Sequence, residues 1–228
     1  MFTLSDVIPW GRSFDEYRRM FDLTEADFRL RILGCADGPA SFNAEATRRG
    51  HRVVSCDPLY RCEVSEIRDR IEATHEQVLD QTRQNRHEFV WRTIPSLEEL
   101  GRVRMTAMQA FIEDFDAGRA EKRYIDAELP ILPFEDSAFD LAVCSHFLFL
   151  YSDHLGEAFH RAAVLELCRV AADVRIFPVL ALGGRPSPFL PSLIQHLRDD
   201  GHDASLERVP YEFQRGGNQM MRIRARRA

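Results

Sequence analysis

The stretch from Arg29 to Leu59, RLRILGCADGPASFNAEATRRGHRVVSCDPL, constrains the fold more than any other segment of this chain. Its pattern predicts a strand over 30–33, a turn of small residues over 34–40, a helix, and a second strand over 52–56. Asp57 follows that second strand directly. A strand, a tight turn, a helix and an acid at the tip of the next strand form a nucleotide-binding βαβ unit, whose acid binds ribose hydroxyls.

A second informative stretch begins at Tyr124 and reads YIDAELPILPFEDSAFDLAVCSH. It predicts a strand over 123–126, then a loop punctuated by two prolines, then a buried strand over 139–144. Ser145 and His146 follow this last strand. Ligands in open α/β sheets bind outside the carboxyl ends of the strands, so both residues are expected near the site that Asp57 marks.

These two stretches resemble class I S-adenosylmethionine-dependent methyltransferases, of the small-molecule, methyltransferase-11-like branch. The family pattern D-A-x-x-L-P-F-x-D-x-S-F-D-L-V is matched by Asp126-Ala127, Leu132-Pro133-Phe134, Asp136-Ser137 and Phe139-Asp140-Leu141. The family's glycine turn, D-x-G-x-G-x-G, is matched less well. Its acid and three glycines align with Gly34, Ala36, Gly38 and Ala40. Asp37, inside the turn, is a candidate replacement for the missing acid.

The resemblance implies S-adenosyl-L-methionine as the cofactor and S-adenosyl-L-homocysteine as its product. The turn would lie at the amino-acid end of the cofactor, Asp57 at the ribose, and Asp126 with its neighbours at the adenine. The predicted cofactor-binding residues are Tyr17, Gly34, Cys35, Ala36, Asp37, Gly38, Asp57, Pro58, Asp126, Ala127 and Ser145.

His146 is the predicted catalytic residue, because it titrates near neutrality and lies near the expected methyl group. The alternative is a histidine that only lines the pocket. The other histidines show no metal-ligand spacing with cysteines or acids, so no metal site is expected. The transfer itself needs little covalent help from protein, since S-adenosylmethionine carries an electrophilic methyl group.

The expected fold is a single α/β domain over 1–228, with a Rossmann-like, doubly wound, mostly parallel sheet. An antiparallel pair of strands is predicted at its C-terminus, over 205–209 and 219–223. Ser13 and Glu16 form a capping box, which predicts a helix in the N-terminal segment 10–22. The resemblance implies that this helix lies over the cofactor. Trp10, Arg12 and Tyr17 are candidates for contacts of that lid, or they pack the helix onto the sheet.

A helical insertion is predicted over about 60–121, with helices near 64–86 and 97–118. It would cap the substrate pocket, or it would serve packing and the formation of a homo-oligomer. Neither helix can bury its apolar stripe alone, so the insertion is not a separate domain.

Composition excludes several classes. The formal net charge of −6 argues against a nucleic-acid partner, because phosphate binding needs clustered cations. The sequence has no run of about 18 apolar residues, so no membrane span is expected. Residues 1–14 do not resemble a secretory signal. The five cysteines form no C-x-x-C pair, which favours reduced thiols and a cytoplasmic location.

The sequence thus predicts methyl transfer to a small-molecule acceptor by direct in-line displacement. Two alternatives stay open. One is a relative that binds S-adenosylmethionine without transferring the methyl group, because the glycine turn departs from the family. The other is an NAD(P)-dependent oxidoreductase, although residues 34–39 do not supply G-x-G-x-x-G.

Overall fold

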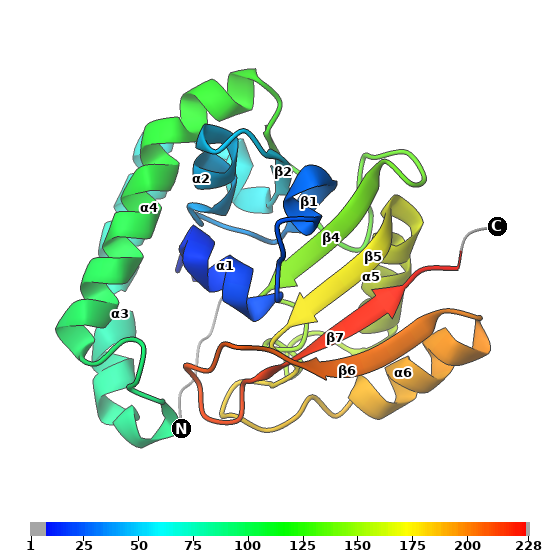
Figure 1. Ribbon diagram of the computed structural model, residues 1–228. Helices are drawn as coiled ribbons and strands as arrows, with labels where there is room; N and C mark the ends of the chain where they lie inside the picture. Colours follow the sequence, from blue (N-terminus) through cyan, green and yellow to red (C-terminus); the bar gives the residue numbers. More distant parts are fainter. Residues whose placement is uncertain (1–7, 227–228) are drawn as a thin grey trace.

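A computed structural model describes residues 8–226 and contains a seven-stranded sheet of order β3-β2-β1-β4-β5-β7-β6 (Figure 1). The strands are β1 (Arg31–Cys35), β2 (Arg52–Cys56), β3 (Tyr124–Ile125), β4 (Phe139–Ser145), β5 (Ala171–Phe177), β6 (Asp203–Arg208) and β7 (Gln219–Arg224). The first five strands are parallel, whereas β7 is antiparallel to both β5 and β6. The order 3-2-1-4-5 is that of a doubly wound sheet. The predicted fold class and the antiparallel C-terminal pair are confirmed.

Helices cover both faces of this sheet (Figure 1). They are α1 (Phe14–Met20), α2 (Phe42–Arg48), α5 (Glu157–Val170) and α6 (Leu190–Asp199). Successive strand residues point to opposite faces, and the two faces build separate apolar cores. Leu33 and Cys144 pack with α5 and α6, whereas Ile32 and Val143 pack with α1 and α2. The sheet is therefore buried on both sides, as parallel sheets usually are.

Strand β2 has the predicted bounds, but the turn after β1 spans 36–41 and not the predicted 34–40. Strand β1 continues to Cys35, and α2 begins only at Phe42, after Ser41 as its N-cap. Ala36 and Gly38 adopt left-handed backbone angles, with φ of 55° and 53°, so Pro39 lies in the turn and not in the helix.

The N-terminal helix has the predicted capping box but is shorter than 10–22, spanning only Phe14–Met20. Residues before it run along the β1–α2 turn. The Arg12 carbonyl accepts a hydrogen bond from the Ser41 amide at 3.0 Å. A Cβ atom added at Gly11 would lie 2.1 Å from the Pro39 carbonyl oxygen. This close approach leaves no room for a side chain at position 11, and α1 begins after its N-cap, Ser13.

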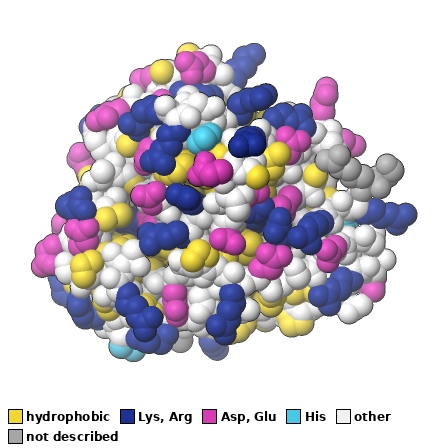
Figure 2. Space-filling view, viewed as in Figure 1, with side chains coloured by type: hydrophobic (Ala, Val, Ile, Leu, Met, Phe, Trp, Pro, Cys, Tyr) yellow, Lys and Arg dark blue, Asp and Glu magenta, His cyan; other side chains and the backbone are white. Residues whose placement is uncertain are grey.

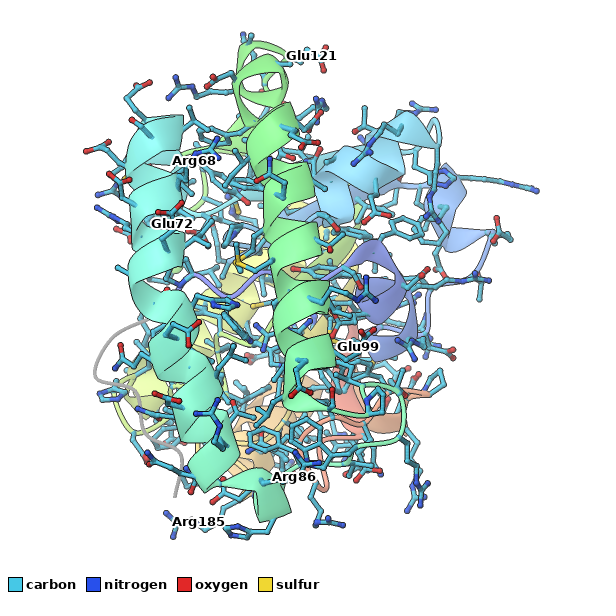
Figure 3. All side chains as sticks on the ribbon, turned by 90° about the vertical axis from the view of Figure 1, so that its left-hand side faces the viewer. Arg68, Glu72, Arg86, Glu99, Glu121 and Arg185 are labelled. Carbon is cyan, nitrogen blue, oxygen red and sulfur yellow. The ribbon has the colours of Figure 1, made fainter. Side chains whose placement is uncertain are left out.

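The insertion forms a long antiparallel pair, α3 (Val64–Gln84) and α4 (Leu97–Ala120), connected through the 3₁₀ turn η3 (Arg86–Glu88). Figure 3 shows the two helices side by side, with Arg68 and Glu121 near one end of the pair and Arg86 and Glu99 near the other. Their facing side chains form a third core with residues of β3 and of the 3₁₀ turn η2 (Pro58–Arg61). The two predicted helices are present, and α4 continues two residues beyond Gly118.

A helix and the fifth parallel strand follow β4. Helix α5 begins at Glu157 after Gly156 as its N-cap, and β5 begins at Ala171 directly after the helix. Strand β5 must start there because Ala171 pairs with Phe139, the first residue of β4. No helix within residues 8–226 is long and apolar enough to cross a membrane.

Candidate functional site: a cavity at the carboxyl ends of the strands

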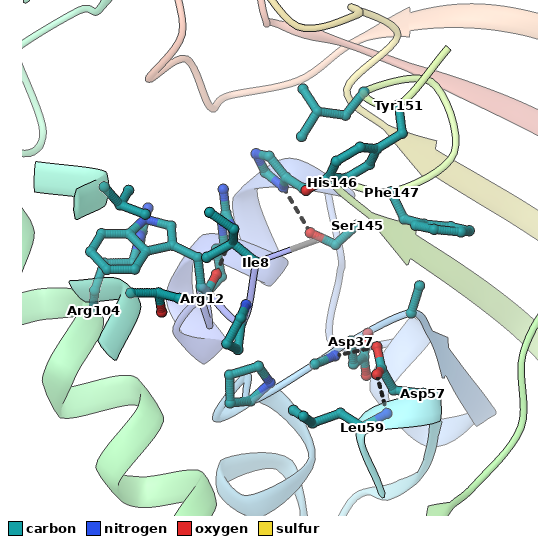
Figure 4. Close-up of a pocket in the computed structure, with 18 of the residues that line it drawn as sticks. Ile8, Arg12, Asp37, Asp57, Leu59, Arg104, Ser145, His146, Phe147 and Tyr151 are labelled. Atoms are coloured by element: carbon teal, nitrogen blue, oxygen red, sulfur yellow. Dashed lines mark hydrogen bonds between the residues drawn. The ribbon is translucent and has the colours of Figure 1, made fainter. Parts of the chain in front are cut away.

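A cavity of about 820 Å³ lies at the carboxyl ends of β1, β2 and β4, where the sheet order reverses between β1 and β4. Ligands of doubly wound sheets bind at this switch point. The insertion and the β6–β7 connection also contribute to the wall: Arg70, Ala73, Thr74, Gln77, Val78, Thr82, Phe89, Leu100, Arg104, Tyr211, Phe213 and Gln214. The insertion therefore contributes directly to the cavity. Figure 4 shows Asp37 and Asp57, which follow β1 and β2, apart from Arg12 and Arg104.

Gly34 and Asp37 fit one another in the β1 turn. A Cβ atom added at Gly34 would lie 1.8 Å from Oδ2 of Asp37, so the Asp37 carboxyl occupies the space of a side chain at position 34. In the aligned family pattern that position carries the acid. The structure thus places an acid where the family has one, but it comes from a residue three positions later.

The Asp37 carboxyl is buried and hydrogen-bonded on both oxygens. Oδ1 accepts from the Tyr17 hydroxyl and Oδ2 from the Ser55 hydroxyl, each at 2.7 Å. Burial raises the pKa of Asp37 to about 7, although these two hydrogen bonds oppose the shift. The Tyr17 ring also stacks on Phe42, with centroids 4.4 Å apart. Tyr17 therefore packs α1 against α2 and also hydrogen-bonds Asp37.

Asp57 lies at the tip of β2 and faces the same cavity. Its carboxylate accepts hydrogen bonds from the amides of Gly38, at 2.9 Å, and Leu59, at 2.8 Å (Figure 4). Burial raises the pKa of Asp57 to about 6 against these two bonds. The Tyr60 hydroxyl binds the Gly38 carbonyl at 2.8 Å, so the turn is anchored on both sides.

The cavity gathers most of the residues that the sequence singled out as cofactor-binding. Those that line it are Tyr17, Cys35, Ala36, Asp37, Gly38, Asp57, Pro58, Ala127 and Ser145. Gly34 is part of β1 and does not line the cavity. Asp126 is also outside, because its exposed side chain pairs with Arg61 at 3.2 Å. Glu128, two residues later, lines the cavity in its place.

His146 lines the cavity at the end of β4 and has a left-handed backbone, with φ of 51°. Such angles are uncommon outside glycine and concentrate at functional sites. Nδ1 lies 2.9 Å from the Ser145 hydroxyl, and the amide donates to the Phe177 carbonyl at 2.7 Å. Burial, with the nearby charges of Arg12 and Arg104, lowers the pKa of His146 well below its usual value. The imidazole is therefore neutral at pH 7.

Sequence analysis missed a buried charged cluster of Arg104, Glu16 and Tyr211. Arg104 and Glu16 are 1% and 2% exposed and form an ion pair. The Tyr211 hydroxyl donates to the other Glu16 oxygen at 2.8 Å. Burial disfavours the Glu16 charge, but the attraction of Arg104 outweighs it and lowers the pKa to about 2. Arg104 and Tyr211 belong to segments far from Glu16 in sequence, so no local signal identified the cluster.

Arg12, named from sequence only as a lid candidate, lies in the cavity beside this cluster. Its guanidinium donates to the Trp10 carbonyl, and its Nε is buried without a hydrogen-bond partner among the described residues. Burial, and then the like charge of Arg104, lower the pKa of Arg12 to about 10. Within residues 8–226, no three or more histidine, cysteine or acidic side chains are placed to hold a metal ion.

The chain is 34% identical to the uncharacterized protein MJ0045 of Methanocaldococcus jannaschii over 222 residues. This region covers 97% of each protein. The chain belongs to the same protein family as MJ0045. No family model matches the sequence. The shared length means that the βαβ unit, the insertion and the C-terminal strand pair all lie within the family's common region.

Solved structures resemble the chain more distantly. The PH0226 protein of Pyrococcus horikoshii is 11% identical with a TM-score of 0.47, over 93% of this chain and 91% of that one. A S-adenosylmethionine-dependent methyltransferase of Aquifex aeolicus is 14% identical with a TM-score of 0.44, over 92% and 93%. A Burkholderia thailandensis 1,6-didemethyltoxoflavin-N1-methyltransferase, solved with S-adenosylhomocysteine, is 14% identical with a TM-score of 0.43, over 87% and 72%. Similarity at this level concerns the fold alone and does not show an activity.

Proposed function

We propose that this protein is a S-adenosyl-L-methionine-dependent methyltransferase that acts on a small molecule. The observation that carries the proposal is the buried acid Asp37 in the β1 turn, beside the β2-tip acid Asp57. A cofactor whose amino-acid end carries an ammonium group suits an acid in this turn, and its ribose hydroxyls suit Asp57. The degenerate glycine pattern thus still provides the polar groups that the cofactor requires.

The same turn disfavours a dinucleotide. A dinucleotide places its pyrophosphate at the first βα turn and uses free amides at the helix N-terminus. Here Asp37 puts a carboxyl into that turn, and the Ser41 amide at the start of α2 already donates to Arg12. We therefore favour S-adenosylmethionine over NAD or NADP.

We place the acceptor against a largely apolar part of the wall. Its residues come from the N-terminal segment, the insertion, the segments after β4 and β5, and the β6–β7 connection: Trp10, Phe89, Phe147, Leu150, Tyr151, Leu155, Phe159, Leu182 and Phe213. Such a wall suits a small organic molecule better than a polymer. On the face shown in Figure 2, basic and acidic side chains are interspersed and form no continuous basic patch. Nucleic-acid binding would favour such a patch.

The cofactor supplies the electrophilic methyl group, and the chain orients the acceptor and excludes water. His146 is proposed to accept the acceptor's proton, because its neutral imidazole borders the cavity. A His146→Asn variant should bind S-adenosylhomocysteine as wild type does but lose activity about 10²–10⁴-fold. Unchanged transfer in this variant would leave His146 as a lining residue only.

A thermal-shift panel tests the cofactor assignment. We expect S-adenosylmethionine and S-adenosylhomocysteine to raise the melting temperature, since a ligand at about 100 times its dissociation constant stabilises by roughly 2.7 kcal/mol. NAD and NADP should have no effect. A shift with NAD or NADP and none with either adenosyl ligand would replace the proposal by an oxidoreductase. Binding without turnover of any acceptor would support the non-catalytic relative.

A further inference from the structure

We propose that the Arg12–Arg104 side of the cavity binds an anionic group, of the carboxylate class, carried by the methyl acceptor. This inference rests on the proposed function, because it assigns the part of the cavity that the cofactor leaves free. Arg12, Arg104 and His146 all line the cavity, and Arg12 and Arg104 both act electrostatically on His146. The class of acceptor can therefore be inferred from the charges that surround it.

The charges at this side do not balance. Glu16 forms an ion pair with Arg104, and no carboxylate within residues 8–226 forms an ion pair with Arg12. Both oxygens of Glu16 already accept hydrogen bonds from other residues. One of its oxygens accepts from Arg104 and the Ser13 amide, and the other accepts from Tyr211. The side therefore carries two guanidinium groups and one carboxylate.

A buried cation without a counter-charge is costly, and an uncharged side chain of similar size would avoid the cost. Both arginines also keep an Nε atom buried without a hydrogen-bond partner among the described residues. A bound carboxylate would supply the missing charge and acceptor atoms together. Arginine is well suited to this task, because its planar fork matches a carboxylate.

The position of the pair favours the acceptor as the source of the anion. In Figure 4 the arginines and His146 lie apart from Asp37 and Asp57, which mark the expected cofactor side. A cavity of about 820 Å³ is near the upper end of the usual range for small ligands, so a second molecule can fit beside a cofactor. The carboxylate of the cofactor is the other source of the same chemistry, and the test must separate the two.

An anionic acceptor would also prepare His146 for its proposed role. Arg12 and Arg104 lower the pKa of His146 by repelling its proton, after the larger effect of burial. A carboxylate bound between the arginines and the imidazole would offset that repulsion. Binding of the correct acceptor would thereby strengthen the base that receives its proton.

The experiment compares acids with their uncharged amides on protein saturated with S-adenosylhomocysteine. The probes are acetate, benzoate and indole-3-acetate against acetamide, benzamide and indole-3-acetamide, measured by calorimetry at constant ionic strength. We expect at least one acid to bind at least about tenfold more tightly than its amide, because hydrogen bonds to charged groups are the stronger ones. Arg12→Gln should abolish the preference, and Arg12→Lys should retain part of it. Arg68→Gln, an exposed arginine on α3, is the matched control and should change nothing.

Equal binding of acids and amides, or no binding of any acid, would overturn the proposal. So would an Arg12→Gln variant that loses affinity for S-adenosylhomocysteine but keeps it for 5′-methylthioadenosine, since the pair would then hold the cofactor's own carboxylate. If wild type binds no adenosyl ligand, the proposed function fails. The acid-against-amide comparison on the free protein then decides the anion site independently.

Discussion

The two sides of the cavity are built in opposite ways. At the acidic side, Asp37 and Asp57 lie within one βαβ unit, and each carboxyl is held by nearby amides or hydroxyls. At the arginine side, the N-terminal segment, α4 and the β6–β7 connection each contribute residues. Glu16 and Tyr211 are bonded there although 195 positions separate them.

The difference lies in what balances the charge. The acids are satisfied by hydrogen bonds from the chain itself and have raised pKa values because of burial. Arg104 is balanced by Glu16, whereas Arg12 is not balanced by any described residue. We infer that the acidic side is complete without ligand and that the arginine side is completed by one.

The largest effect is expected from Glu16→Gln, which removes the carboxylate that pairs with Arg104. Breaking a buried ion pair by removing one partner typically costs roughly 3–5 kcal/mol, because the other charge stays buried. Chemical denaturation should show this loss in the free energy of unfolding. Asp15→Asn, an exposed residue of the same helix, is the control and should stay within about 0.5 kcal/mol. A loss below about 1 kcal/mol for Glu16→Gln would contradict the charge balance described here.

The acidic side is tested by Gly34→Asp, which restores the family's acid in its usual position. The new side chain would meet the Asp37 carboxyl, so we expect a destabilisation of about 1–3 kcal/mol, as for other overpacked sites. Adding Asp37→Ala should recover most of it, together with binding of S-adenosylhomocysteine.

Gly156→Asp is the matched control, since a side chain there meets nothing within 4 Å. If the single variant Gly34→Asp is as stable as wild type, or if Asp37→Ala gives no recovery, the two positions do not share one space.

A pH titration of stability tests the burial of Asp37. The pKa of Asp37 is raised to about 7, above its ordinary value of about 3.9 in an unfolded chain. The folded protein therefore holds a proton that the unfolded chain releases. This contribution is present below about pH 4 and is lost as the pH rises through about 7. The profile of Asp37→Asn should be flatter than that of wild type over this window. Parallel profiles would show that Asp37 does not carry the effect.

The smallest effect is expected from Ala36→Gly, which restores one of the family's glycines. Ala36 has a φ of 55°, and this left-handed conformation costs roughly 1–2 kcal/mol for residues with a Cβ. Part of the gain is lost to the entropy of glycine in the unfolded chain, so we expect a net stabilisation of about 0.5 kcal/mol. Differential scanning calorimetry should detect a small rise in melting temperature. A clear fall would mean that the Ala36 methyl group stabilises the turn by packing.

Sequence analysis located the acidic side because local patterns determine it. Strand β2 and the acid after it follow from a contiguous run of residues, and the glycine turn could be aligned although it is degenerate. Asp126, which the alignment placed with its neighbours at the adenine, does not line the cavity, whereas Ala127 and Glu128 do. In a loop that follows a two-residue strand, side chains do not alternate regularly between two faces. The sequence therefore could not predict which of these side chains faces the cavity.

The arginine side could not be found in the same way. Arg104 lies on the buried side of α4, where a helical pattern by itself suggests an apolar residue. Its partner Glu16 was recognised only as half of a capping box, and Tyr211 received no role. Contacts between segments so distant in sequence depend on how the helices of the insertion pack on α1, and composition or periodicity does not encode that packing.

The central claim is that the cofactor uses the acidic side and leaves the arginine side free. Titration calorimetry of S-adenosylhomocysteine into Asp57→Asn and Arg12→Gln tests it in one experiment, with the circular dichroism spectra of both variants confirming that they are folded. We expect Asp57→Asn to weaken binding about tenfold or more, since hydrogen bonds to a charged group are lost. Arg12→Gln should leave the affinity within about threefold of wild type, which is less than the tenfold change that about 1.4 kcal/mol represents. Full affinity in Asp57→Asn together with a large loss in Arg12→Gln would contradict the claim.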